Sequence, residues 1–135
     1  MTIANEVDRI ALLLREDSLH VSFQAIHRGG SNSGMSWVIH VSGSVDWTTS
    51  SQLRAHVSDL ILSVGPARVV VDLAGVTHLD SSGIGALMAS LRDANQNHIR
   101  FLLAALNGSL RRLLERTQLH TVFDIRSSVQ DALRA

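Results

Sequence analysis

The chain of 135 residues contains no cysteine. Without thiols it forms neither a disulfide framework nor a thiolate zinc site, and it has no cysteine nucleophile. It also has no excess of charge, because 12 basic residues balance 12 acidic ones. A nucleic-acid-binding domain usually carries a basic excess, so the composition does not indicate that class of protein.

Long apolar runs are missing too. No run approaches the roughly 18 apolar residues that a membrane-spanning helix needs. The N-terminal stretch MTIANEVDRIALLLRED places Glu6, Asp8 and Arg9 where a signal peptide would have an unbroken apolar segment. We therefore expect a protein that is neither exported nor embedded in a membrane, and whose location is cytoplasmic.

What is present indicates one folded α/β domain. The chain is 45% hydrophobic and 18% charged, which fits a protein with a buried core. Strand-like and helix-like patterns alternate, and this predicts a mixed or mostly parallel sheet with helices packed on it. Strands are expected over 21–27, 37–42, 68–73, 99–105 and 122–125. Helices are expected over 2–17, from 46–49 to 64, from 80 to about 95, over 108–117, and after Ser127 or Ser128.

The segment before the first strand has an amphipathic helical pattern. Ile3, Val7, Ile10 and Leu14 recur at helical spacing and form an apolar stripe. Such a stripe has to be covered by the domain itself or by a partner. We divide the chain into an N-terminal helical extension over 1–19 and a domain over 20–135, and expect the extension to support a homodimer or a partner contact.

The most informative segment is VVVDLAGVTHLDSSGIGALM, over residues 69–88. An apolar run ends at Asp72, a short loop is expected to follow, and Asp80-Ser81-Ser82-Gly83 then opens a helix whose inner face includes Met88. A helix N-terminus has free N–H groups and a partial positive charge, which suit an anion such as phosphate. The two serines are therefore candidates for a phosphorylation switch as well as for helix capping.

Three segments resemble the STAS family, and within it the anti-sigma factor antagonists. They are VSGSVDWTTSSQLR over 41–54, VVVDLAGVTHLDSSGIGAL over 69–87, and NGSLRRLLERTQLHTVFDI over 107–125. The D-S-S-G match is specific because it follows a buried strand and opens a helix. The resemblance implies a single STAS-like domain, with a mixed sheet of four or five strands and helices mainly on one face.

The resemblance also implies a function and a site. In the antagonists, the serine before this glycine is phosphorylated by a partner that is both an anti-sigma factor and a serine kinase. By position that serine is Ser82, and Ser81 is the less favoured candidate. Asp46, Asp80 and Gly83 are the residues implied around it. The unmodified protein would bind the anti-sigma factor and so regulate sigma-dependent transcription, whereas the phosphorylated protein would not bind. The implied protein is a binding module without a cofactor, not an enzyme.

Two glycines and two departures from the family pattern stand out. We expect Gly83 and Gly85 to let a partner backbone approach closely, because they lack side chains. The family usually has glycine where this chain has Gln118, and a glycine in the loop that here contains Asn95, Asn97 and His98. Neither departure touches the D-S-S-G turn.

Other interpretations stay open. The serines and Asp46 are also explained as helix caps, and a STAS domain can serve as a scaffold, a ligand sensor or a lipid-transport subunit without phosphorylation. A serine hydrolase would need His78, Ser82 and Asp72, but the G-x-S-x-G motif is missing. The seven histidines are scattered, so no metal site is expected. The helix-face cations Arg111, Arg112 and Arg116 fit an anion, an acidic partner or simple solvation.

Overall fold

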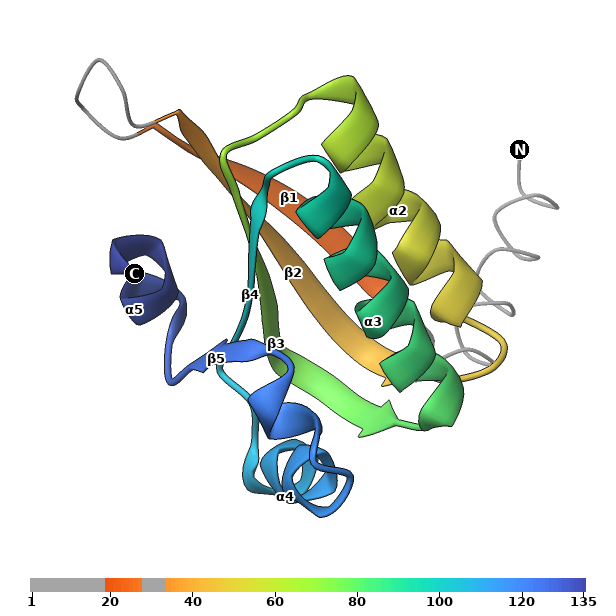
Figure 1. The fold of residues 1–135 in the computed structure, drawn as a ribbon. Helices are drawn as coiled ribbons and strands as arrows, with labels where there is room; N and C mark the ends of the chain where they lie inside the picture. Colours follow the sequence, from red (N-terminus) through yellow and green to blue (C-terminus); the bar gives the residue numbers. More distant parts are fainter. Residues whose placement is uncertain (1–18, 28–33) are drawn as a thin grey trace, which may run out of the picture.

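Five strands form one mixed sheet in the order β1-β2-β3-β4-β5. The computed structural model describes residues 19–27 and 34–135, so the expected helix over 2–17 lies outside the described residues. Strand β1 runs antiparallel to β2, and every later pair is parallel (Figure 1). The strands are β1 (His20–His27), β2 (Met35–Val45), β3 (Arg68–Leu79), β4 (Arg100–Ala104) and β5 (Asp124–Arg126).

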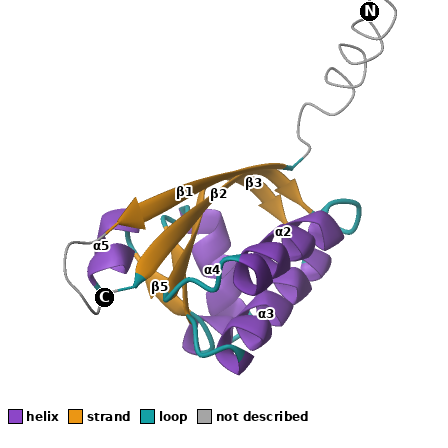
Figure 2. Ribbon diagram, turned by 90° about the horizontal axis from the view of Figure 1, so that it is seen from above, coloured by secondary structure: helices purple, strands orange, loops and turns teal. Residues whose placement is uncertain are grey.

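Helices α2 and α3 lie side by side on one face of the sheet (Figure 2). Their inner residues pack on every second strand residue, such as Ile39, Val71 and Leu103, as strand geometry requires. Residues of the opposite face, such as Val70, pack against Ala132 of α5. The α/β fold with helices mainly on one face is thus confirmed. The helical elements are α2 (Ser50–Ser63), α3 (Ser81–Gln96), α4 (Gly108–Arg116), the 3₁₀ turn η1 (Leu119–Thr121) and α5 (Val129–Arg134).

Strand β3 corrects the expected loop after Asp72, because it continues to Leu79. Its pairing with β2 shifts register between His40 and Ser42 instead of ending. The Asp72 carboxylate accepts a hydrogen bond from the Ala74 N–H at 3.0 Å, and a Cβ on Gly75 would lie 2.7 Å from the Ser42 Cβ. A bulge, which inserts extra residues without breaking the ladder, replaces the loop.

Two smaller boundaries also differ from expectation. The strand expected over 122–125 is β5, which starts at Asp124 because residues 119–121 form the turn η1. Helix α2 has Thr49 as its N-cap, with no capping hydrogen bond from that side chain. Asp46, which the sequence also explained as a helix cap, therefore lies before the helix rather than at its start.

Helices α3 and α4 both end in a residue with left-handed backbone. His98 has φ 57° after α3, and Gln118 has φ 63° after α4. This conformation is favourable for glycine and costs other residues steric strain. The chain therefore keeps the backbone turn that glycine normally makes after a helix, but makes it with larger residues.

Candidate functional site

Asp80 fixes the start of α3 and ties it to the loop between β2 and α2. One carboxylate oxygen accepts a hydrogen bond from the Gly83 N–H at 3.0 Å, so the N-cap is Asp80 and not Ser81 or Ser82. The other accepts one from the Trp47 N–H at 3.3 Å. A single carboxylate therefore holds together two segments that are 33 residues apart in the sequence.

Ser81 and Ser82 are the first two residues of α3. Ser81 is exposed and Ser82 is partly buried. Within the described residues neither hydroxyl forms a hydrogen bond, and the first N–H groups of a helix have no partner inside it. The site thus combines two unbonded hydroxyl groups with backbone donors and the positive end of the helix dipole, which favours an anion.

Gly83 is buried, and its missing side chain serves the protein's own packing. A Cβ at this position would lie 2.3 Å from the Val45 carbonyl oxygen and 2.5 Å from a methyl group of Leu79. This corrects the expectation that Gly83 makes room for a partner, because β2 already occupies that space. Gly85 is exposed, and a Cβ there would meet nothing within 4 Å, so only Gly85 leaves surface free.

Asp46 organises the loop that leads to Trp47. Its carboxylate accepts hydrogen bonds from the Thr48 hydroxyl at 2.6 Å and the Thr48 N–H at 2.9 Å. These two hydrogen bonds hold the pKa of Asp46 below its ordinary value, and the bond from the Thr48 hydroxyl has the larger effect. The Thr49 hydroxyl closes the loop by donating to the Ser44 carbonyl at 2.8 Å. Through Trp47 this loop reaches Asp80, so the predicted site residues do lie together.

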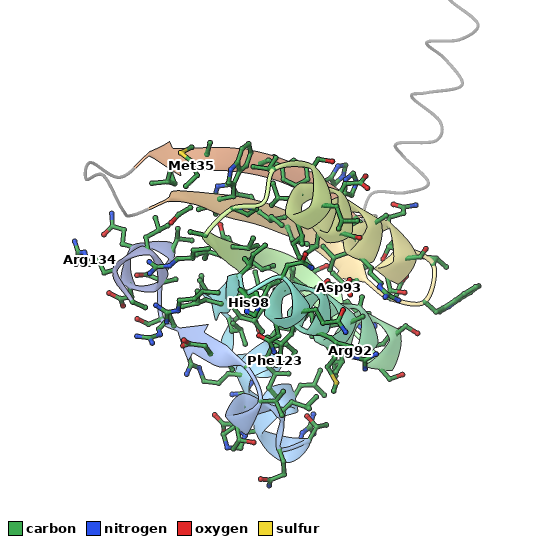
Figure 3. The ribbon with its side chains drawn as sticks, turned by 45° about the horizontal axis from the view of Figure 1, so that its top comes forward. Met35, Arg92, Asp93, His98, Phe123 and Arg134 are labelled. Carbon is green, nitrogen blue, oxygen red and sulfur yellow. The ribbon has the colours of Figure 1, made fainter. Side chains whose placement is uncertain are left out.

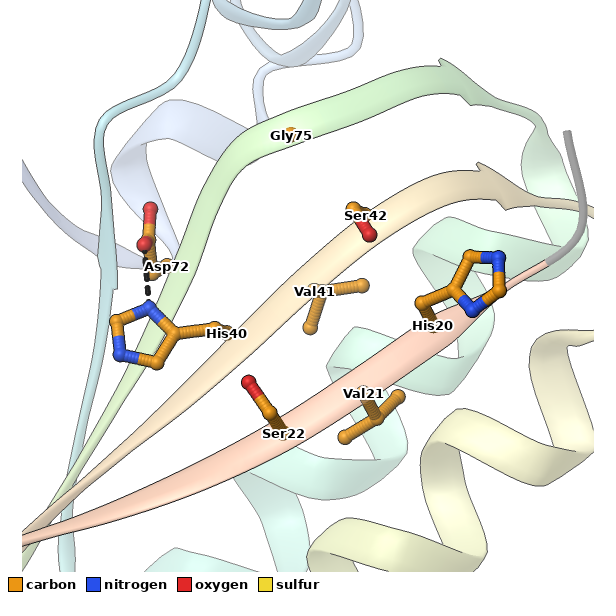
Figure 4. Close-up of a pocket in the computed structure, with 8 residues that line it drawn as sticks. All are labelled: His20, Val21, Ser22, His40, Val41, Ser42, Asp72 and Gly75. Atoms are coloured by element: carbon orange, nitrogen blue, oxygen red, sulfur yellow. Dashed lines mark hydrogen bonds and ion pairs between the residues drawn. The ribbon is translucent and has the colours of Figure 1, made fainter.

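The residues of the hydrolase interpretation do not assemble. Asp72 binds Nδ1 of His40 at 2.7 Å, on the sheet face away from α2 and α3 (Figure 4). The second ring nitrogen of His40 lies 3.0 Å from the Gln24 side-chain oxygen. His78 is exposed and forms no hydrogen bond to Ser82. Over residues 19–27 and 34–135, no cluster of histidine and acidic side chains suits a metal ion, and no helix is long and apolar enough to cross a membrane.

The family model for the STAS domain matches residues 30–132. This chain belongs to the STAS domain family. Among solved structures it is similar to an anti-sigma factor antagonist from Mycobacterium paratuberculosis, at 24% identity over 87% of this chain and 93% of that one, with a TM-score of 0.72. Phosphorylated SpoIIAA of Bacillus is 19% identical over 84% of this chain and 97% of that one, with a TM-score of 0.57.

A third similar structure belongs to a transporter family. The sulfate transporter family protein from Wolinella succinogenes is 15% identical over 72% of this chain and 80% of that one, with a TM-score of 0.64. At such identities these structures show a shared STAS fold and leave function to be argued from the site.

Two exposed apolar side chains of this STAS domain were not predicted. Trp47 is 78% exposed beside the Asp80 contact. Met88 was expected on the inner face of α3 but is 37% exposed, and helical spacing puts it on the same side as Ser81 and Gly85. The only sequence signal for Trp47 was its place in a polar turn, outside any apolar period. Trp47 and Met88 thus add exposed apolar area beside the start of α3.

Proposed function

We propose that this STAS domain is an anti-sigma factor antagonist. It binds an anti-sigma factor with serine kinase activity through the surface around the start of α3, and phosphorylation at Ser82 switches that binding off. The observation that carries the proposal is the D-S-S-G turn, which opens α3 with unbonded hydroxyl groups on a backbone fixed by Asp80. Similar structures named as anti-sigma factor antagonists support it, and one of these proteins, SpoIIAA, is also known in a phosphorylated form.

The binding surface combines a flat helix face with an aromatic anchor. Gly85 leaves the middle of the face open, and Met88 adds exposed apolar area. Trp47 projects from the adjoining loop. Tryptophan is enriched among the residues that dominate protein–protein affinity, because it buries a large area when a partner closes over it.

A phosphate on Ser82 would change this surface without unfolding the domain. It adds roughly −1.5 to −2 charges. The free N–H groups at the start of α3 stabilise those charges, while the carboxylate of Asp80 repels them and holds the Trp47 loop only through one 3.3 Å hydrogen bond. At an interface the charge must also lose water, and each loss of about 1.4 kcal/mol weakens binding about tenfold.

The direct test is intact-protein and peptide mass spectrometry after incubation with ATP and the candidate anti-sigma kinase from the same genome. We expect one added phosphate that maps to Ser82, disappears in Ser82→Ala and persists in the matched control Ser81→Ala. In a binding assay with the same kinase, Ser82→Glu should weaken the complex by at least about tenfold. Binding of Ser82→Glu as tight as wild type would contradict the switch.

The alternative is a STAS domain used without phosphorylation, as a scaffold, a ligand sensor or a subunit of lipid transport. The similar fold of a sulfate transporter family protein supports this alternative. It is favoured if no cognate kinase modifies Ser82 and if genes for transport proteins, rather than for a kinase, adjoin the gene.

The N-terminal extension over 1–19 is proposed as a separate contact element, because its stripe of Ile3, Val7, Ile10 and Leu14 needs cover. Analytical ultracentrifugation of wild type and of the Ile10→Asp/Leu14→Asp variant tests it. A wild-type homodimer that becomes a monomer in the variant is expected, whereas identical sedimentation of the two proteins would contradict a role in self-association.

A further inference from the structure

We infer that α4, η1 and β5 form a second docking surface, one that binds an extended acidic segment of another protein. We name it the α4 surface and define it by five cationic or titratable side chains. It lies at the lower end of the sheet in Figure 1, away from α2 and the upper part of α3, and the inference does not depend on the proposed function of Ser82. Its members are Arg111, Arg112, Arg116, His120 and Arg126.

The charges of α4 are not used inside the domain. Leu110 and Leu114 bury one side of the helix, so its arginines point to solvent. Within the described residues Arg111, Arg112 and Arg116 form no ion pair. Arg54 pairs with Asp93 at 3.9 Å. Within the α4 surface, Arg126 pairs with Asp124 at 2.7 Å, and Arg100 pairs with the same carboxylate at 3.3 Å. The cations of α4 therefore remain available to an outside partner.

A hollow of about 520 Å³ lies beside these cations. Arg111, Glu115 and His120 line one part of it, and the consecutive residues 123–126 line the rest. A second hollow of about 250 Å³ is lined by Ser109, Arg112, Glu115 and Arg116. The two hollows adjoin at Glu115, and among the residues that line them Glu115 and Asp124 carry negative charge.

The form of the surface favours a polypeptide over a compact small anion. The larger hollow follows β5, which pairs with β4 alone and is the edge of the sheet, so an occupant lies along an open edge rather than inside a cavity. Arg112 and Arg116, which line the smaller hollow, are one helical turn apart, with Cβ atoms about 5–6 Å from each other. In an extended peptide, side chains on the same side repeat about every 6.6 Å. Carboxylates at alternate positions of such a peptide therefore have a spacing close to that of the two arginines.

The chemistry of the cations favours carboxylate groups. The chain contains no lysine, so every fixed positive side chain is an arginine. Its planar guanidinium donates in a fork that fits a carboxylate through two parallel hydrogen bonds. Phe123 also lines the larger hollow but is only 5% exposed, so the arginines provide the contacts with the peptide.

The test is fluorescence anisotropy with a labelled deca-glutamate peptide and a deca-serine peptide as the uncharged control. We expect saturable binding of deca-glutamate to the full chain that weakens as salt is raised. Arg111→Glu/Arg112→Glu should weaken it at least about tenfold. The matched control is Arg92→Glu/Arg134→Glu, which makes the same charge change on α3 and α5 (Figure 3) and should alter affinity less than about twofold.

Heteronuclear NMR locates the peptide. Shifts confined to α4, η1 and the residues 123–126 are expected, with Ser82→Asp binding as the wild type does. The inference is overturned by equal losses in the two double variants, by shifts centred elsewhere, or by a single-stranded oligonucleotide or anionic phosphatidylglycerol vesicles binding the same arginines more tightly than the peptide.

Discussion

Helices α3 and α4 begin in the same way but present opposite surfaces. Each follows a parallel central strand, and each has a side-chain cap three residues before the N–H that it binds, at 3.0 Å for Asp80 and 2.9 Å for Asn107. Around Asp80 the surface carries carboxylates, serines and an exposed tryptophan. Around α4 it carries exposed arginines, of which Arg111, Arg112 and Arg116 have no ion pair within residues 19–27 and 34–135. One structural unit, strand–cap–helix, thus gives a single small domain two chemically distinct contact surfaces.

The two starts also differ in how closely the backbone packs. Gly83 lies against the Val45 carbonyl oxygen, whereas a Cβ on Gly108 would meet the guanidinium of Arg112 at 3.3 Å. The first neighbour is a backbone atom held in a sheet, and the second is the end of a flexible side chain. The α3 start is therefore rigid by construction, while the α4 start can tolerate change, and the predictions below probe that contrast.

The largest effect is expected from Gly83→Ala. Its Cβ would overlap the backbone of β2, so we expect the free energy of unfolding to fall by about 3 kcal/mol. Gly108→Ala should change it by less than about 0.5 kcal/mol, because Arg112 can move aside. Urea unfolding followed by circular dichroism measures both. A similar decrease in the free energy of unfolding for the two variants would contradict the distinction between a rigid start of α3 and a tolerant start of α4.

The caps come next. Asp80→Ala removes the bond to Gly83 and the link to Trp47, and should cost about 2 kcal/mol of unfolding free energy, the upper end of the range for caps. Asn107→Ala should cost about 1 kcal/mol. Asp80→Asn, which keeps an acceptor oxygen, is the control and should lose less than Asp80→Ala. A larger loss at Asn107 than at Asp80 would show that the Trp47 link contributes nothing.

The two helix ends, unlike the starts, should respond alike. His98→Gly and Gln118→Gly each place glycine at a left-handed position and should raise the free energy of unfolding by about 0.5–1 kcal/mol. Gln96→Gly, inside α3, should instead lower it by up to about 1 kcal/mol. Thermal and urea unfolding measure the stability of these variants. A Gln118→Gly variant less stable than wild type would mean that the Gln118 side chain stabilises the fold by more than its left-handed backbone destabilises it.

The smallest expected effect is a difference between the two surfaces in how the pKa of a carboxyl group responds to salt. Hydrogen bonding from Arg126, and the charges of Arg126 and Arg100, lower the pKa of Asp124, whereas the uncharged groups of Thr48 lower that of Asp46. Both carboxylates therefore favour the folded state above their ordinary pKa of 3.8, and that contribution is lost as the pH falls through the lowered values.

Raising NaCl from about 0.1 to about 1 M shortens the screening length from about 10 to about 3 Å. The pKa of Asp124 should then rise toward its ordinary value, while that of Asp46 moves less. Carbon-13 NMR titration of the side-chain carboxyl groups measures both. An equal response to salt at the two carboxylates would contradict the assignment of these causes.

Much of the site followed from local sequence. The cap at Asp80 and the helix that starts at Ser81 depend on residues within one turn of each other, so their pattern is readable without the rest of the chain. The nearly continuous apolar run over 68–73 was enough to predict a central strand. The roles of Ser82 and Asp46 remain predictions, since the geometry places them without testing phosphorylation.

What the sequence by itself determined is the order of elements, the buried faces, the capped start of α3 and the STAS resemblance, because each depends on near neighbours. The tertiary structure alone decided that β3 runs on past Asp72, that Gly83 packs on Val45, that Asp80 reaches Trp47, and that Trp47 and Met88 stay exposed. These features depend on strand register and on segments some 33 residues apart, and local propensity carries no information about such pairings.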